Sequence, residues 1–169
     1  GIIEITAQLL LSGVIDSKGR MHQRPGVKET KGRREFLIAS ATGPNPEVTF
    51  TQQDVREVQV AKGAIRSGIG VLLEVNKVRV EEIDQVIIAG AFGSYIDVAS
   101  AVAIGMMPGL PLERFKQVGN AAGMGARMAL ISSALRKKAP ALASRVRYVE
   151  LGSAPQFSET FLKACSLAT

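Results

Sequence analysis

The chain has 169 residues, a net charge of +6 and 46% apolar residues, which fits one globular domain and argues against a disordered chain. The single cysteine, Cys165, excludes an internal disulfide, a structural zinc site and an iron–sulfur cluster built from this chain alone, and the single histidine, His22, excludes two-histidine zinc motifs. No apolar stretch is long enough to span a bilayer and no signal peptide opens the sequence, so we expect a cytoplasmic protein with no membrane contact.

Positive charge is concentrated between residues 16 and 35. This segment holds seven Lys and Arg side chains against three acidic ones, and so carries +4 of the net charge. It has no Phe, Tyr or Trp on which bases could stack, so we expect no nucleic-acid partner. We expect a solvated, mobile loop over 16–35, and the alternative is a surface that docks an acidic partner.

The first third of the chain predicts a helix, two short strands and a long helix. Residues 1–11 carry apolar side chains at helical spacing. Short strands are expected at 36–39 and 48–50. Thr51 is a suitable cap for the long helix, which continues to about Asn76.

The remainder of the chain predicts alternating strands and helices. Strands with continuous apolar cores that alternate with helices are typical of a largely parallel sheet, so we expect an α/β fold. The expected strands and helices, in chain order, are 85–89, 97–105, 115–118, 120–138, 145–149 and 155–166.

The strand at 85–89 leads directly into the glycine-bracketed turn Gly90-Ala91-Phe92-Gly93. Gly90 and Gly93 allow positive φ angles and a close approach of the backbone to a ligand. In open α/β sheets, ligands bind at the carboxyl ends of parallel strands. The spacing differs from the dinucleotide fingerprint and from the Gly-Lys-Ser/Thr phosphate loop, which argues against a Rossmann-type dehydrogenase. A tight turn without a ligand remains the alternative.

The strand at 115–118 also runs into a glycine-rich helix start. Asn120 is a candidate cap for this helix, and Gly123 and Gly125 place small residues inside its first turns. Because interior glycines cost a helix nearly 1 kcal/mol each, we expect some backbone or ligand to approach closely here. A neighbouring helix and a nucleotide lying across the domain both remain open.

Lys62 and Arg66 lie four residues apart and so share one face of the long helix. Like charges at this spacing are mildly destabilising, and an acidic partner, or the phosphate or adenine edge of a ligand, would offset the repulsion. Two solvated cations are the alternative.

Together these segments resemble the adenosine-binding half of the actin-like (ribonuclease H-like) ATPase fold, which sugar kinases, heat-shock chaperone ATPases and actin share. The chain is most similar to the C-terminal region of the reductive activators of corrinoid proteins. The resemblance is carried by VTFTQQDVREVQVAKGAIRSGIGVLLE, IDQVIIAGAFGSYIDVASAVAIGMMPGLP and VGNAAGMGARMAL, and it extends more weakly to both ends of the chain.

The resemblance implies a single domain over 1–169 that is the later part of the second ATPase lobe. Members of the family use ATP, bound with magnesium, to drive an electron from a ferredoxin-like iron–sulfur domain onto cobalt(II) of a corrinoid protein, which restores cobalt(I) for methyl transfer. The implied site residues are Gly90, Ala91, Phe92 and Gly93 in the adenosine motif, Lys62 and Arg66 beside the adenine pocket, and Asn120 and Gly123 on the helix that links the lobes.

The chain departs from the family pattern in two respects. It has neither the phosphate-binding hairpins, in which an acidic residue precedes Gly and Thr, nor the cysteines of the iron–sulfur domain. We therefore expect it not to hydrolyse ATP alone. The alternatives are a non-catalytic binding or homodimerisation module, and a part of another actin-like enzyme such as a dehydratase activator or a small-molecule kinase.

Overall fold

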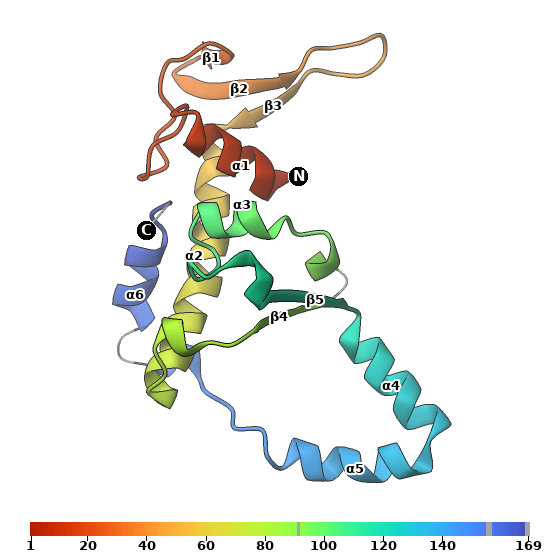
Figure 1. Cartoon of the computed structure of the whole chain (residues 1–169). Coiled ribbons are helices and arrows are strands. Elements are labelled where there is room, and N and C mark those ends of the chain that lie inside the picture. The colour runs from red at the N-terminus through yellow and green to blue at the C-terminus, as the bar shows by residue number, and fades with distance from the viewer. Residues whose placement is uncertain (91, 155–156, 168–169) are drawn as a thin grey trace.

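The computed structural model describes residues 1–90, 92–154 and 157–167 of the chain. Helix α2 (Gln52–Asn76) forms the long axis of the molecule, with a three-stranded sheet at one end and α6 (Phe157–Ala164) along its side (Figure 1). None of the helices in the described residues is long and apolar enough to cross a membrane.

The sheet at the N-terminal end of α2 is antiparallel. Its strands are β1 (Val27–Thr30), β2 (Arg33–Ala39) and β3 (Val48–Thr51), paired in that order. Lys31 and Gly32 connect β1 to β2 with φ angles of 51° and 72°, the backbone of a two-residue hairpin turn. The expectation of a loop throughout 16–35 is therefore wrong for its second half. The high charge of these strands concealed them, because three of the four residues of β1 are exposed.

The long helix begins as the sequence predicts. The Thr51 hydroxyl accepts a hydrogen bond from the Asp54 amide (3.1 Å), and the Asp54 carboxylate accepts one from the Thr51 amide (2.7 Å). This capping box satisfies amides that would otherwise lack a partner at the first turn of α2.

The hydrophobic core lies where α1 (Ile2–Leu11), α3 (Val98–Ala103), the antiparallel sheet and the first half of α2 meet. Leu167, close to the C-terminus, is fully buried in the same core. Met106 is buried there as well. The buried members are Ala7, Leu9, Val14, Ile15, Met21, Val27, Phe50, Val55, Val58, Ala101, Ile104, Met106 and Leu167.

A second, smaller sheet consists of β4 (Val86–Ala89) and β5 (Phe115–Gly119), which pair in parallel as the sequence predicts. The expected burial is found only in part, since Ile88 is buried but Ile87 is 59% exposed. The prediction of a further strand at 145–149 is wrong: this segment has no regular structure. Parallel strands are normally covered on both faces, so the β4–β5 sheet is open to further polypeptide.

The single helix expected at 120–138 is in fact two helices, α4 (Ala121–Ile131) and α5 (Ser133–Ala143). Ser132 separates them with an extended backbone, and its hydroxyl accepts a hydrogen bond from the Leu135 amide (3.3 Å). No residue of α4 or α5 is buried, and the two helices extend away from the core (Figure 1). The start of the last predicted helix, at 155 and 156, lies outside the described residues. The short 3₁₀ helices are η1 (Val80–Glu82), η2 (Phe92–Ser94), η3 (Leu112–Arg114) and η4 (Leu151–Ser153).

The C-terminal segment is attached closely to α2. The Gln59 side chain donates a hydrogen bond to the Cys165 carbonyl (2.9 Å), and the Leu167 amide donates one to the Ser17 carbonyl (2.7 Å). A Cβ at Gly63 would lie 2.9 Å from the Cys165 Sγ, so this glycine permits the close approach.

Replacing Gly63 tests this packing. In Gly63→Ala the added methyl group collides with Cys165, and we expect the free energy of unfolding to fall by about 1–3 kcal/mol. Gly70→Ala in the same helix is the matched control, because its Cβ would meet Thr160 at an ordinary 3.5 Å and alanine favours the helix by up to about 1 kcal/mol. Urea denaturation measures both. Equal stability of the two variants would contradict the tight α2–α6 contact.

Candidate functional site

The two glycine bends lie side by side at the carboxyl ends of β4 and β5. The Gly90 amide donates a hydrogen bond to the Gly119 carbonyl at 2.7 Å. Both residues have positive φ angles, 109° at Gly90 and 63° at Gly119. The structure therefore brings together the two segments that the sequence analysis singled out, at the edge of a parallel sheet where ligands bind in open α/β folds.

The glycines of these bends differ in the space that surrounds the position of a side chain. A Cβ at Gly93 would lie 2.8 Å from the Ile88 side chain, and one at Gly123 would lie 2.6 Å from the Asn120 side chain, so local packing excludes larger residues at both. Among the described residues, no atom lies within 4 Å of the position that a Cβ at Gly90 would take. The backbone of Gly90 therefore faces open space, which is what a ligand that approaches the main chain needs.

The helix starts beside these bends are both capped by side chains, at Asn120 as the sequence predicts and at Asp97. Asn120 accepts a hydrogen bond from the Gly123 amide (2.9 Å) and so caps α4 directly after the contact between the strand ends. Asp97 accepts one from the Ser100 amide (2.7 Å), and the hydrogen bonds from Ser100 hold the pKa of this carboxyl below its ordinary value. Capping thus accounts for Asp97.

Gln117 is a positioning residue that the sequence analysis missed. Its amide nitrogen donates hydrogen bonds to the Gly93 carbonyl (2.6 Å) and to the Ile96 carbonyl (2.8 Å), which fastens the turn after β4 to β5. The strand FKQVG offers no signal that singles out Gln117, because Lys116 beside it is also polar and the partners of Gln117 come from another segment.

Lys62 has partners within the protein. Its side chain is fully buried, and the ammonium group donates hydrogen bonds to the carbonyls of Ser166 and Gly105. Burial lowers the pKa of Lys62 to about 8. These contacts give Lys62 a structural role that joins α2 to the ends of α3 and α6.

Arg66, one turn further along α2, is half-buried. The hydrogen bonds and ion pairs found among the described residues connect neither Arg66 nor Lys62 to the Gly90 turn. Ala91 and the side chain of Phe92 lie outside the part of the chain that the structure describes. The nucleotide-binding roles of these four residues thus remain predictions.

Residues 1–169 match the family described as the C-terminal domain of RACo, the ASKHA domain. The chain belongs to this family. A solved structure of a reductive activator for corrinoid, iron-sulfur protein superposes with a TM-score of 0.88 and 32% identity, over 99% of this chain and 27% of that one. The expected actin-like α/β fold is therefore confirmed.

Two curated relatives agree with this assignment. The chain is 36% identical over 176 residues to the corrinoid activation enzyme RamQ of Eubacterium limosum. The matched region covers 96% of this chain and 29% of RamQ. It is 32% identical over 75 residues to the Co(II) methylated amine-specific corrinoid protein reductase of Methanosarcina barkeri, which covers 44% of this chain and 14% of the reductase. The chain thus spans less than a third of the length of these relatives.

The buried position of Lys62 predicts an unusual pH dependence of stability. In the unfolded chain its pKa is near 10.5 and in the folded chain it is about 8, so between these values the unfolded state binds more protons. The free energy of unfolding contributed by this group therefore rises with pH in this window, by up to about 1.4 kcal/mol per pH unit. Urea denaturation from about pH 7 to about pH 9.5 measures it. Lys62→Met should lack the rise, and parallel curves for both proteins would contradict it.

Proposed function

We propose that this chain is the adenosine-binding part of an ATP-dependent activator that reduces the cobalt(II) of a corrinoid protein to cobalt(I). The observation that carries the proposal is the contact between Gly90 and Gly119, with open space above Gly90, at the carboxyl ends of two parallel strands. A flat purine requires such a bare stretch of backbone, and membership of the ASKHA family supports a nucleotide as the ligand.

The remaining groups of the nucleotide site belong to other polypeptide. The chain holds no hairpin with an acidic residue before Gly and Thr, so we assign the triphosphate and its magnesium ion to segments outside this sequence. Gly90, Ala91, Phe92 and Gly93 would then hold the adenosine, with Arg66 beside it, and Asn120 with Gly123 would fix the start of α4. Because Lys62 is engaged by carbonyl groups, we assign it to positioning of α2.

The exposed apolar surface supports this division. Ile87 and Val118 on the small sheet are 59% and 40% exposed, and Leu130 and Ile131 at the end of α4 are 78% and 74% exposed. Large apolar side chains of a parallel sheet and its helix are normally covered. We assign the cover to the rest of an ATPase domain, since the matched solved structure is more than three times as long as this chain.

ATP acts in this scheme by changing the state of the complex. A nucleotide held between two lobes shifts an equilibrium only by as much as it binds one state more tightly than the other. The single electron that converts cobalt(II) to cobalt(I) comes from an iron–sulfur domain outside this sequence. The partner is a corrinoid protein, as the names of the relatives indicate for them. We place the protein in the cytoplasm, where the free thiol of Cys165 stays reduced.

The adenosine site is tested by Gly90→Ala in the intact protein. The methyl group would enter the space that adenosine requires, and we expect the dissociation constant of ATP to rise by about tenfold, or about 1.4 kcal/mol. Isothermal titration calorimetry measures the constant, and the reduction of the corrinoid, followed by its absorption spectrum, should slow in parallel.

Gly43→Ala is a control for the replacement of a glycine with a positive φ angle outside the proposed site. Gly43 also has a positive φ angle (58°) and open space around its Cβ position, but it lies between β2 and β3. Its substitution should leave ATP binding unchanged. Unchanged ATP affinity in Gly90→Ala would instead favour a binding or dimerisation module without a nucleotide.

A further inference from the structure

A cavity of about 1020 Å³ lies between the N-terminal end of α2, the β1–β2 hairpin and the segment around Arg20. Its lining is polar and rich in arginine: Arg20, Arg33, Arg34 and Arg56 contribute to it together with Glu29 and Glu35. Neither the adenosine site nor the contacts of Lys62 use any of these residues. Much of its lining comes from residues 16–35, the segment in which positive charge is concentrated.

Three of the four guanidinium groups are available to a ligand. Among the described residues, the side chains of Arg20, Arg33 and Arg56 have no hydrogen-bond or ion-pair partner, and all three residues are exposed. Arg34 differs, because it donates to the Glu29 carboxylate (3.0 Å) and to the Met21 carbonyl (2.8 Å).

The two carboxylates of the cavity are already engaged. Glu29 pairs with Arg34, and Glu35 accepts a hydrogen bond from the Thr49 hydroxyl (3.2 Å). Neither neutralises the three free arginines through a direct contact. The cavity therefore presents an excess of positive charge, and the carboxylates of Glu29 and Glu35 lie in the same lining.

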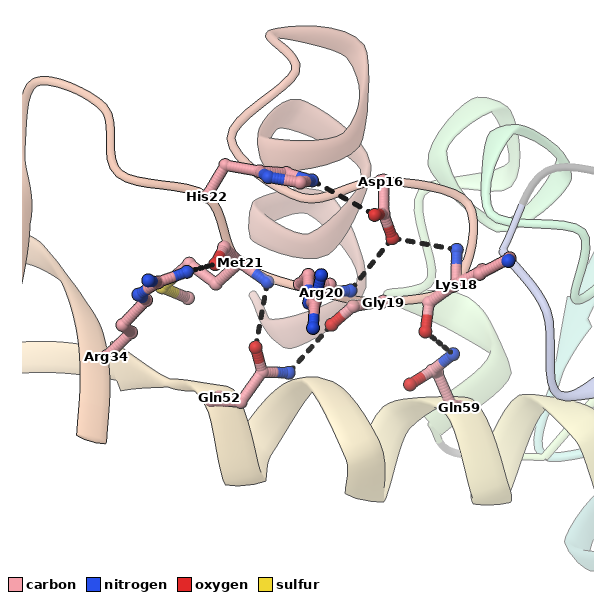
Figure 2. A network of polar contacts seen from close by, with 9 residues as sticks. All are labelled: Asp16, Lys18, Gly19, Arg20, Met21, His22, Arg34, Gln52 and Gln59. Atoms are coloured by element: carbon pink, nitrogen blue, oxygen red, sulfur yellow. Dashed lines mark hydrogen bonds and ion pairs between the residues drawn. The ribbon is translucent and has the colours of Figure 1, made fainter. Parts of the chain in front are cut away.

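Residues 20–22 line the cavity, and a polar network holds the segment 16–22 to which they belong in place (Figure 2). Gln52 of α2 accepts a hydrogen bond from the Met21 amide (2.8 Å) and donates one to the Gly19 carbonyl (2.7 Å). Asp16 accepts hydrogen bonds from the Arg20 amide (2.9 Å) and from His22 (3.0 Å). The Arg20 amide, and then His22, hold the pKa of Asp16 below its ordinary value, so the carboxylate that organises the segment stays charged.

We propose that this cavity is a docking site for the acidic surface of the corrinoid protein on which the activator acts. The inference rests on the proposed function. The three free arginines lie on separate elements whose backbone is already fixed. Binding would therefore cost little reorganisation, and their guanidinium groups can receive the carboxylates of a protein partner. The mixed lining argues against a free phosphate compound, because Glu29 and Glu35 would repel a dianion, whereas a protein surface carries charges of both signs.

The test uses the intact protein and its corrinoid protein. In the triple variant R20E/R33E/R56E we expect the dissociation constant of the complex to rise by at least about tenfold, because opposed charges become like charges. The affinity of the wild-type protein should fall as salt is added, and that of the variant should not. Arg56→Glu alone should give a smaller loss in the same direction, which guards against misfolding of the triple variant.

The matched control is K137E/K138E/R145E. It makes the same change in net charge on exposed residues in α5 and just after it, none of which lines the cavity. It should change the dissociation constant by less than about threefold. ATP affinity, which Gly90 governs, should equal that of the wild-type protein in both triple variants. If the control lost as much affinity for the corrinoid protein, the net charge of the protein and not the cavity would determine binding. That result would overturn the inference.

Two further outcomes separate this inference from the proposed function. If the wild-type protein binds no corrinoid protein, the proposed function fails and the docking site fails with it. If the wild-type protein binds and R20E/R33E/R56E binds equally well, only the docking site is refuted. Titration with inorganic pyrophosphate covers the remaining case: binding that the triple variant loses while it keeps its corrinoid-protein affinity would identify a small-anion site instead.

Discussion

The buried ammonium group of Lys62 joins three parts of the chain that are far apart in sequence. It lies on α2 and donates hydrogen bonds to the carbonyl groups of Gly105, 43 residues away, and of Ser166, 104 residues away. A buried charge is costly unless polar groups surround it, and the carbonyls at the ends of α3 and α6 provide these groups. The position of the C-terminal segment beside α2 depends on this interaction.

Helix α2 also relates the two surfaces to which we assign functions. Its capped N-terminal turn forms part of the arginine-rich cavity, and its middle carries Lys62 and the half-buried Arg66.

The small parallel sheet has a different character from the core. Its strand ends are joined by the hydrogen bond between Gly90 and Gly119, and Gln117 fastens the turn between them, yet Ile87 remains largely exposed. Local hydrogen bonds therefore shape the proposed adenosine site although its outer faces are exposed. This agrees with a chain that spans less than a third of its relatives, whose remaining length is available to cover these faces.

Local sequence patterns were sufficient to predict the helix caps at Thr51 and Asn120, the parallel pair of strands and the glycine bends at their ends. These features follow from residues close together in the chain, which is why local patterns predicted them. The family was recognisable for the same reason, because its motifs are continuous stretches.

Contacts between distant segments set the role of Lys62, form the charged β1–β2 hairpin and leave 145–149 without a strand. The sequence placed Lys62 and Arg66 on one helix face but could not show that distant carbonyls enclose the lysine. Whether a charged or apolar segment becomes a strand depends on a neighbour with free backbone groups, and that neighbour is supplied by the fold. The unpaired arginines of the cavity were hidden for the same reason, since charge balance depends on which side chains meet in space.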